Sequence, residues 1–562
     1  MTSVKSPGLR CIHDVGKPLS RIPTAREIDL MDPNENLDDR RAVAAPTWLR
    51  HPRGVRLPAV IALALLLAAC TQDYRPTADH EPLRAPPEFS YGPDGVTHAE
   101  LRASQAHVNI GNERYVSLVF NSDYDAPLLR TRPGGVVSIR LDNQMDEKTN
   151  LHFHGMTISP LEAGDNIFRE TPPHQVGIYN LKIPPDHSPG AYWYHSHFPG
   201  GSERQVAAGI AGPILVDGML DPFPELAGIK ERVLALRNFQ KTATGKVASE
   251  IITSAASIRT VNGQSQPVIE IQPGETQLWH FMNIAANQYF RIRVKGQPLQ
   301  ILSRDGNTVN QKVMTDELLI GPSARFSVLV VGPEAGDHAI ELGSGNTGPA
   351  GDQYKGETLA ILRSSGPRTA TKAITSAYPV SEDFSKEPIA HHREFSFEDS
   401  PTDGNAFMIN GRRFDRGRVD TTVKLGDVEE WRLTNPSQEL HQFHIHQTDF
   451  QVVAINDKPV PFDGYRDNVF IPATGSITLR IPFRDPTMLG KFVYHCHILE
   501  HEDGGMMQVV QVVKPQDYEQ AVTLEPLGGI YGDNQLCSYL DNTGQKLVVP
   551  NPSNFPATGG AP

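Results

Sequence analysis

The sequence has few cysteines, and its N-terminal apolar run is too short to cross a membrane. Four cysteines occur in 562 residues, at Cys11, Cys70, Cys496 and Cys537, and no two of them form a CxxC pair. This wide spacing argues against both a disulfide framework and a zinc ribbon. The apolar run from Leu57 to Ala69 falls short of the ~20 residues that span a bilayer as a helix.

An excess of basic residues is also missing. The chain has 52 Lys and Arg residues against 65 Asp and Glu residues, which gives a formal net charge of −13 at pH 7. Acidic chains of this kind bind nucleic acid and anionic membrane surfaces poorly, so we expect no nucleic-acid partner. The length and the ordinary composition indicate a globular protein of three or four domains.

The N-terminal segment has the order of a secretion signal. Three arginines precede the apolar run, namely Arg50, Arg53 and Arg56, and small residues follow it. The end of the run, Leu67-Ala68-Ala69-Cys70, resembles the lipobox of bacterial lipoproteins, in which the cysteine is lipidated. We predict that residues 1–69 are an export leader and that the protein is lipid-anchored at Cys70 in the cell envelope or periplasm. The alternative is a buried apolar element that ends in cysteine. Because signals usually have ~15–30 residues, Met31 is one candidate for the true start.

The rest of the chain is predicted to be mostly β. Residues 70–95 are polar and rich in proline, and we expect them to form a tether. Beyond them, short alternating runs such as "YVSLVF" and "SITLRI" are bounded by Gly, Pro and Asn. These runs indicate strands, and no long helical period competes with them.

Three segments of the chain resemble one another. They are "PGGVVSIRLDN" (133–143), "PGETQLWHFMN" (273–283) and "LGDVEEWRLTN" (425–435), and each places Gly and Asn nine residues apart around an alternating strand. Repetition at near-domain spacing indicates three homologous β-domains. We predict that these domains span residues 96–228, 229–385 and 386–515, and that residues 516–562 form a C-terminal tail.

Four His-x-His pairs lie in the first and third repeats. They are His152 and His154 in "LHFHG", His195 and His197 in "GAYWYHSH", His444 and His446 in "HQFHIH", and His495 and His497 in "GKFVYHCH". On a strand, residues i and i+2 point to the same face, so each pair aims two imidazoles in one direction. The second repeat has Ile292 and Val294 at the corresponding positions. Eight converging imidazoles predict a metal cluster of copper, zinc, iron or nickel.

The stretch "HCHILEHEDGGMM", from His495 to Met507, predicts a different metal site. His441, Cys496 and His501 offer two nitrogens and a thiolate, and Met506 offers a weak axial ligand, which is the blue-copper arrangement. The first repeat has Thr149, Ser196 and Gly201 at the positions of the two histidines and the cysteine, so it cannot hold this centre. A core methionine at Met506 and an inert buried thiol at Cys496 are the alternatives, and Met507 is assigned to packing.

This set of motifs resembles the multicopper oxidase family over about residues 100 to 515. The resemblance implies an all-β fold of three cupredoxin-like Greek-key β-sandwich domains. It also implies four copper ions: a type 1 copper on His441, Cys496, His501 and Met506, a type 2 copper on His152 and His444, and a type 3 pair on His154, His195 and His497 and on His197, His446 and His495. The middle domain is then a spacer without copper ligands.

The resemblance further implies that the protein oxidises a reductant in four one-electron steps and reduces dioxygen to water. Cys496 then connects the type 1 copper to the type 3 pair through its neighbours His495 and His497. Glu502 and Asp165 resemble the acids that supply protons in the family. Around Asp165 the loop departs from the family pattern, because it reads Asp165-Asn166 in place of Asp-Gly.

The reductant is the least specified part of the prediction. A laccase-like oxidation of phenolic or aromatic compounds is our first expectation, and a cuprous or ferrous metallo-oxidase with a role in copper tolerance is the second. The scattered methionines argue mildly against a dedicated cuprous oxidase. A copper nitrite reductase and a non-enzymatic copper-binding envelope protein are less favoured, since all eight histidines of the cluster are present.

Overall fold

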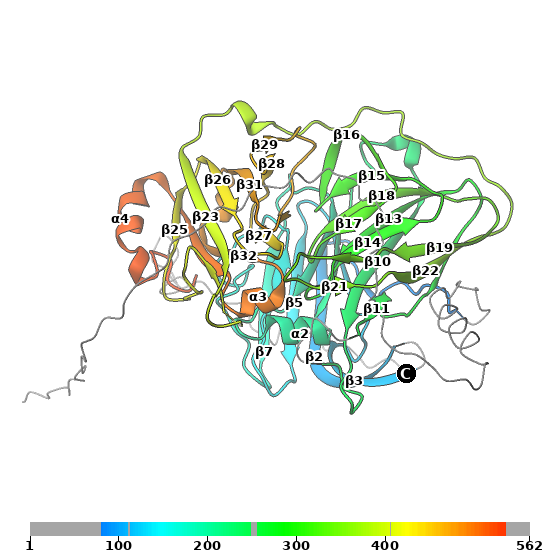
Figure 1. The fold of residues 1–562 in the computed structure, drawn as a ribbon, viewed down its shortest axis with the longest axis horizontal. Coiled ribbons are helices and arrows are strands. Elements are labelled where there is room, and N and C mark those ends of the chain that lie inside the picture. Colours follow the sequence, from blue (N-terminus) through cyan, green and yellow to red (C-terminus); the bar gives the residue numbers. More distant parts are fainter. Residues whose placement is uncertain (1–79, 111–112, 249–255, 405, 535–562) are drawn as a thin grey trace, which may run out of the picture. The chain divides into compact units, whose positions relative to one another are not determined.

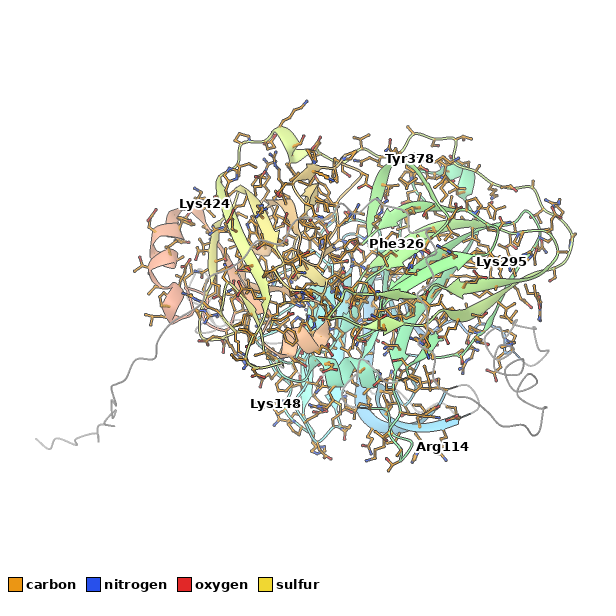
Figure 2. All side chains as sticks on the ribbon, in the orientation of Figure 1. Arg114, Lys148, Lys295, Phe326, Tyr378 and Lys424 are labelled. Atoms are coloured by element: carbon orange, nitrogen blue, oxygen red, sulfur yellow. The ribbon has the colours of Figure 1, made fainter. Side chains whose placement is uncertain are left out.

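The computed structural model describes residues 80–110, 113–248, 256–404 and 406–534 (Figure 1). Strands make up most of the regular structure and form three successive sandwiches, each with two sheets, so the predicted all-β fold is confirmed. Apolar side chains fill the space between the sheets of each sandwich. Figure 2 draws the side chains as sticks on the ribbon. The predicted leader, Cys70 and Cys537 lie outside the described residues.

The first sandwich encloses a core that includes Phe153 and Tyr194. One sheet has the order β3-β2-β5-β7 and contains β2 (Val96–Ile110), β3 (Glu113–Phe120), β5 (Val136–Asn143) and β7 (Val176–Lys182). The other has the order β1-β4-β9-β8-β6 and contains β1 (Glu88–Phe89), β4 (Leu128–Thr131), β6 (His152–His154), β8 (Gly190–His195) and β9 (Ala211–Val216). Two histidine-bearing strands, β6 and β8, are therefore neighbours at one edge.

The second sandwich packs around Trp279 and Phe281. Its larger sheet has the order β11-β10-β13-β18-β15-β16, with β10 (Lys230–Phe239), β11 (Ile258–Val261), β13 (Thr276–Asn283), β15 (Leu299–Arg304), β16 (Asn307–Thr315) and β18 (Arg325–Val331). The smaller sheet has the order β12-β22-β19-β14-β17, with β12 (Val268–Ile271), β14 (Phe290–Val294), β17 (Leu318–Ile320), β19 (Gly336–Leu342) and β22 (Glu357–Ser364). A short ribbon pairs β20 (Gly345–Asn346) with β21 (Gln353–Tyr354).

The third sandwich repeats the strand order of the second around Trp431 and Phe443. One sheet has the order β24-β23-β26-β31-β28-β29, with β23 (His391–Asp399), β24 (Phe407–Ile409), β26 (Val428–Thr434), β28 (Gln451–Ile455), β29 (Lys458–Pro459) and β31 (Ser476–Pro482). The other has the order β25-β33-β32-β27-β30, with β25 (Thr421–Lys424), β27 (His441–Ile445), β30 (Asn468–Ile471), β32 (Gly490–Cys496) and β33 (Met507–Val513). This matching order is the structural counterpart of the sequence repeat.

The asparagine of each repeat closes a turn. Asn143, Asn283 and Asn435 follow the alternating stretches in or just after β5, β13 and β26, and each side-chain amide donates to the backbone carbonyl four or five residues on, at 2.7 to 2.8 Å. Each side-chain oxygen accepts the backbone N–H two residues on. Because an Asn side chain can donate and accept at once, it fixes the loop that leads to the next strand.

The described residues also form short helices and turns between and after the strands. They are α2 (Ser202–Ala208), α3 (Leu499–Asp503) and α4 (Tyr518–Thr523), with the 3-10 turns η1 (Pro224–Leu226), η2 (Phe384–Lys386), η3 (Pro486–Met488), η4 (Pro515–Asp517) and η5 (Glu525–Leu527). Helices α2 and α3 lie side by side (Figure 1). The Asp503 carboxylate accepts the backbone N–H groups of Gly200, Ser202 and Glu203, which docks the third sandwich on the first.

Two predicted segments differ from the structure. The expected tether of residues 70–95 is part of the fold from His80 onward, because β1 pairs in parallel with β4 and the Leu83 N–H donates to the Val268 carbonyl at 2.8 Å. The expected tail of residues 516–562 folds up to Asn534, whose Oδ1 accepts the N–H of Lys491 at 2.8 Å. Hydrogen bonds to strands of the sandwiches hold both segments. Within the described residues, no helix is both long and apolar enough to span a membrane.

Candidate metal centre

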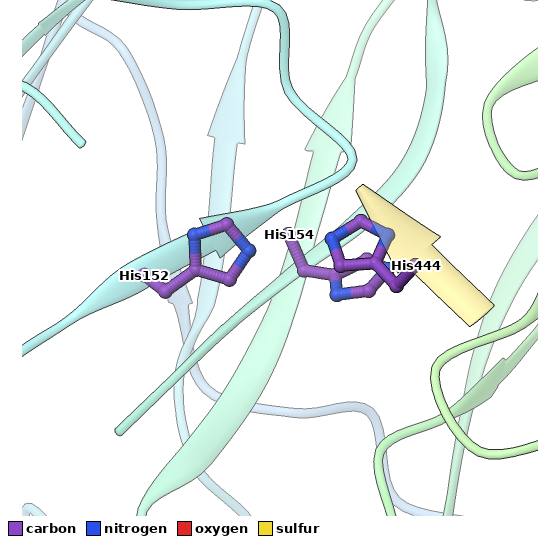
Figure 3. A group of neighbouring side chains, drawn as sticks. All are labelled: His152, His154 and His444. Carbon is purple, nitrogen blue, oxygen red and sulfur yellow. The ribbon is translucent and has the colours of Figure 1, made fainter. Parts of the chain in front are cut away.

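The four His-x-His pairs meet between the first and third sandwiches. Strands β6 and β8 are antiparallel neighbours with His152 opposite His195, and β27 and β32 are paired in the same way with His444 opposite His495. All eight histidines are at most 1% exposed. Rings from the two sandwiches stack on each other, His152 on His446 at 3.6 Å and His154 on His444 at 3.8 Å between ring centroids. Figure 3 shows His152, His154 and His444 directed toward one another.

The ring nitrogens form groups of three. In each of the following groups the ligand atoms lie within 4.8 Å of one another: His152, His154 and His444; His154, His195 and His497; His197, His446 and His495. The last two groups are the two sets expected for a type 3 pair. The first contains both residues expected for the type 2 ion. The structure thus brings together all eight histidines that the sequence singled out, whereas Ile292 and Val294 of the second sandwich are buried in an apolar core.

The donor set fits metal ions. Buried ring nitrogens with no hydrogen-bond partner among the described residues include His152 Nε2, His154 Nδ1, His195 Nε2, His444 Nε2, His446 Nδ1 and His497 Nε2. Leaving so many buried polar atoms unpaired is costly unless a ligand meets them. Burial also lowers the pKa of these rings, to about 3 for His195 and about 4 for His197, so they are neutral at pH 7 and free to coordinate.

Asp165 lies against the first-sandwich part of the cluster. Both of its carboxylate oxygens are 3.0 Å from His152 Nδ1, and it also accepts the N–H of Phe153 and the side-chain amide of Gln447. Burial raises the pKa of Asp165 to about 8. The carboxyl group orients His152 and can hold a proton beside the cluster at neutral pH.

Glu502, on α3, serves the opposite side of the cluster. Its Oε2 is 3.1 Å from His495 Nδ1, and its Oε1 is 3.5 Å from His197 Nδ1. Burial opposes its ionisation, but its interactions with His197 and His495 outweigh burial and hold the pKa of Glu502 at about 2. The two predicted acids therefore differ in charge, because Glu502 is an anion where Asp165 keeps its proton.

The predicted blue-copper residues form a second site in the third sandwich. His441 Nδ1 and His501 Nδ1 are 3.1 Å apart, and the Cys496 sulfur lies 3.8 Å from the first and 3.7 Å from the second. All three are at most 1% exposed. Met506 is fully buried in the same core cluster as Cys496, and its carbonyl accepts the Cys496 N–H at 3.0 Å. Two imidazoles and a thiol with facing donor atoms fit a copper ion.

The equivalent place in the first sandwich is filled by hydrogen bonds. Thr149 and Ser196, the counterparts of His441 and Cys496, both donate their hydroxyls to the Gln205 side-chain oxygen at 2.7 Å. Gln205 is fully buried on α2 and its amide donates to the Lys148 carbonyl at 2.7 Å. The expectation that this domain cannot hold the blue centre agrees with these contacts, and Gln205 is a residue that sequence reasoning missed.

Sequence reasoning also missed three carboxylates that border the blue site. Glu500 and Glu439 lie 3.6 and 3.7 Å from His501 Nε2, and Asp399 lies 3.5 Å from His441 Nε2. Burial and then repulsion from neighbouring carboxylates raise the pKa of Glu439 and of Glu500 to about 8 each. Glu439 and Glu500 lie next to histidine motifs in the sequence, and this position could have indicated a role at the blue site. Asp399 gave no such signal, because it lies 42 residues before His441, at the end of β23.

The sequence is similar to those of known proteins. Sequence profiles of the multicopper oxidase family match residues 101–220, 236–367 and 386–516. The multicopper oxidase mco of Staphylococcus epidermidis is 23% identical over 436 residues, which cover 75% of this chain and 89% of that protein. The cell division protein FtsP of Escherichia coli (strain K12) is 25% identical over 407 residues, covering 68% of this chain and 83% of that protein.

A solved structure supports the fold. The multicopper oxidase from Campylobacter jejuni, described as a metallo-oxidase, has a TM-score of 0.69 at 24% sequence identity and covers 77% of this chain and 95% of that chain. At this identity the likeness shows the fold alone. The three profile matches together extend over most of the sequence and include every histidine of the cluster. The chain belongs to the multicopper oxidase family, and this membership implies that it binds copper.

Proposed function

We propose that the protein is an oxidase that uses four copper ions to couple four one-electron oxidations of a reductant to the reduction of dioxygen to water. The observation that supports it most strongly is that a buried Cys-His site and a buried eight-histidine cluster are joined by adjacent residues of one strand. The ligand sets would be His441, Cys496, His501 and Met506 for type 1, His152 and His444 for type 2, and His154, His195 and His497 with His197, His446 and His495 for type 3. Bound copper would accept electrons at the first site and reduce dioxygen at the second.

Cys496 supplies the connection between the two sites. Its side chain belongs to the blue site, while its neighbours His495 and His497 belong to two different groups of the cluster. The path from the sulfur to either ring therefore runs through covalent bonds of consecutive residues. The His495 Nδ1 also lies 2.9 Å from the Cys496 carbonyl oxygen, which offers a shorter route by hydrogen bond.

Asp165 and Glu502 lie beside the cluster in different protonation states, so they have different roles. Asp165 keeps a proton at neutral pH and lies beside His152, so it is the group to donate protons to oxygen reduced in the cluster. Glu502 is ionised and lies beside His495 and His197, so it orients both rings and has no proton to donate at neutral pH.

The carboxylates beside the blue site favour a cationic reductant. Glu439, Glu500 and Asp399 lie near the outward nitrogens of both histidines, and each is partly exposed, at 16%, 29% and 36% of the side chain. A metal ion such as Fe(II) or Cu(I) would favour the ionised form of these carboxyl groups and would be attracted by it, whereas a neutral phenol would not. We therefore place metal-ion oxidation ahead of the laccase-like activity expected from the sequence.

Oxygen uptake by the copper-loaded protein tests the proposal. We expect a blue protein with four coppers that consumes oxygen fastest with Fe(II) or Cu(I), more slowly with phenols, and at background rates without a reductant. Mn(II) and aromatic amines complete the series. A blue protein that consumes no oxygen with any of these reductants would instead be a copper-binding envelope protein. The envelope location, the lipid anchor at Cys70 and the domain boundaries stay predictions.

A further inference from the structure

Arg325 of the second sandwich lies next to the histidine cluster. This residue is the first of β18 and is 0% exposed. Its Nη1 donates to Asp467 Oδ1 at 2.8 Å and its Nη2 donates to Asp467 Oδ2 at 2.5 Å, so the two side chains form a two-pronged ion pair across the boundary with the third sandwich. Paired hydrogen bonds of this kind fix geometry as well as charge.

Asp467, directly before β30, contacts two histidines of the cluster. Its carbonyl oxygen is 2.7 Å from His444 Nδ1, and its Oδ1 is 3.3 Å from His154 Nε2. The opposite nitrogens, His444 Nε2 and His154 Nδ1, belong to the atoms left without a hydrogen-bond partner among the described residues. Asp467 thus selects the nitrogen that each ring turns toward the cluster, which is the usual role of a hydrogen-bond partner behind a metal ligand.

Arg325 is held from the other side as well. Its Nε donates to the Ala191 carbonyl of β8 at 3.1 Å, and its backbone N–H donates to Asp305 Oδ1 at 2.9 Å. Gly155, the residue after His154, has φ +83°, and a Cβ built there would lie 2.3 Å from both Arg325 Nη2 and Asp467 Oδ2. The ion pair therefore packs directly on the backbone that carries His154, where no side chain fits.

We propose that Arg325 is a positioning residue for the copper cluster: through Asp467 it fixes the orientation of His154 and His444. This inference rests on the proposed function, because it concerns the same cluster. It gives the middle domain, which contributes no ligand, a direct part in building the metal site. A neutral side chain at residue 325 would leave Asp467 buried without its counter-charge and free to turn away from His154.

Copper-loaded Arg325→Met and Arg325→Lys variants test the role of this residue. We expect both to keep the blue absorption of the Cys496 site, and the cluster coppers to bind about 10- to 100-fold more weakly in Arg325→Met. The Arg325→Lys variant keeps the charge but not the paired hydrogen bonds, so its loss should be smaller. The readouts are copper content by elemental analysis, the type 2 electron paramagnetic resonance signal, and the near-ultraviolet absorption of the paired coppers.

Arg237→Met is the matched control. Arg237 is also a buried arginine of the second sandwich, 3% exposed on β10, and it also donates to a carbonyl of the first sandwich, at Ala211. It makes no hydrogen bond to a cluster histidine or its carboxylates within the described residues. Its substitution should lower the melting temperature without changing the cluster signals.

Each result decides one proposal. Cluster signals and copper content in both Arg325 variants equal to those of Arg237→Met would overturn the positioning role. A wild-type protein that binds no copper would instead contradict the proposed function. If Arg325→Met does not fold, Arg325→Lys carries the same comparison against the control.

Discussion

The first and third sandwiches share an arrangement of strands and histidines, but different residues line the equivalent pocket in each. In both, a His-x-His pair flanks a central residue on the second strand and a short helix follows. In the third sandwich that helix is α3 and supplies His501 to the blue site, whereas in the first it is α2 and supplies Gln205 to a hydrogen-bonded Thr149 and Ser196. In the first sandwich, the Gln205 side chain fills the pocket and accepts hydrogen bonds from its hydroxyls. In the third sandwich, imidazoles and a thiol line the equivalent pocket and can bind a metal ion.

The largest expected effect comes from Cys496→Ser, which gives the third sandwich the residue type that the first has at the equivalent position, Ser196. Cys496→Ser removes the thiolate but keeps the neighbouring histidines. We expect the blue colour to vanish and oxygen uptake with every external reductant to fall to background, because the connection to the cluster starts at this sulfur. Visible absorption, copper analysis and oxygen uptake check this, and three coppers should remain bound. Turnover that persists in this variant would contradict the electron route.

The next effect tests the acids that each sandwich contributes. In Asp165→Asn the amide cannot donate the same proton, so we expect turnover to fall about 10²- to 10⁴-fold while the blue absorption is kept. Steady-state oxygen uptake measures this, with copper content as the check that the ligands are intact. Glu502→Gln is the partner variant from the third sandwich. If Asp165→Asn turns over at the wild-type rate, another group supplies the protons.

The third prediction concerns the closed pocket of the first sandwich. Gln205→Leu leaves the hydroxyls of Thr149 and Ser196 and the carbonyl of Lys148 without their amide partner. We expect the free energy of unfolding to fall by about 1–3 kcal/mol per buried group left unpaired, with no change in the blue absorption. Denaturant unfolding of the copper-free protein measures this. A change in the blue absorption would mean that the two pockets are coupled.

The smallest effect concerns the carboxylates that only the third sandwich places beside its pocket. Glu439→Gln removes a carboxyl group near His501 that can ionise when a cation binds beside it, so we expect the KM for Fe(II) or Cu(I) to rise roughly fivefold, or about 1 kcal/mol. The KM for a neutral phenol should not change. Initial rates with both classes of reductant check this, and Glu317→Gln, a carboxylate of the second sandwich paired with Arg291, is the control. Equal shifts for cation and phenol would remove the case for a cationic reductant.

Much of the site could be predicted because strands have a period of two. The His-x-His pairs and the Cys496 neighbourhood are local patterns, and the repeat supplied its own comparison in Thr149 and Ser196. Gln205 could not be found this way, because the sequence of its helix does not indicate that its side chain accepts hydrogen bonds from hydroxyls far away in the chain. Arg325 and Asp467 are 142 residues apart and meet only when two sandwiches pack. The fold of residues 80–95 was missed because proline-rich composition says nothing about pairing with an existing edge.

The histidines of the cluster are far apart in the sequence, which limits when a cell can load the cluster with copper. His197 and His495 lie 298 residues apart, and their Nε2 atoms are 3.2 Å apart in the folded chain. A ribosome that has made only the first two sandwiches has therefore produced four of the eight cluster histidines and none of the three groups in full. Copper acquisition must follow completion of the polypeptide, so a culture starved of the metal should accumulate full-length colourless protein that turns blue when copper is restored.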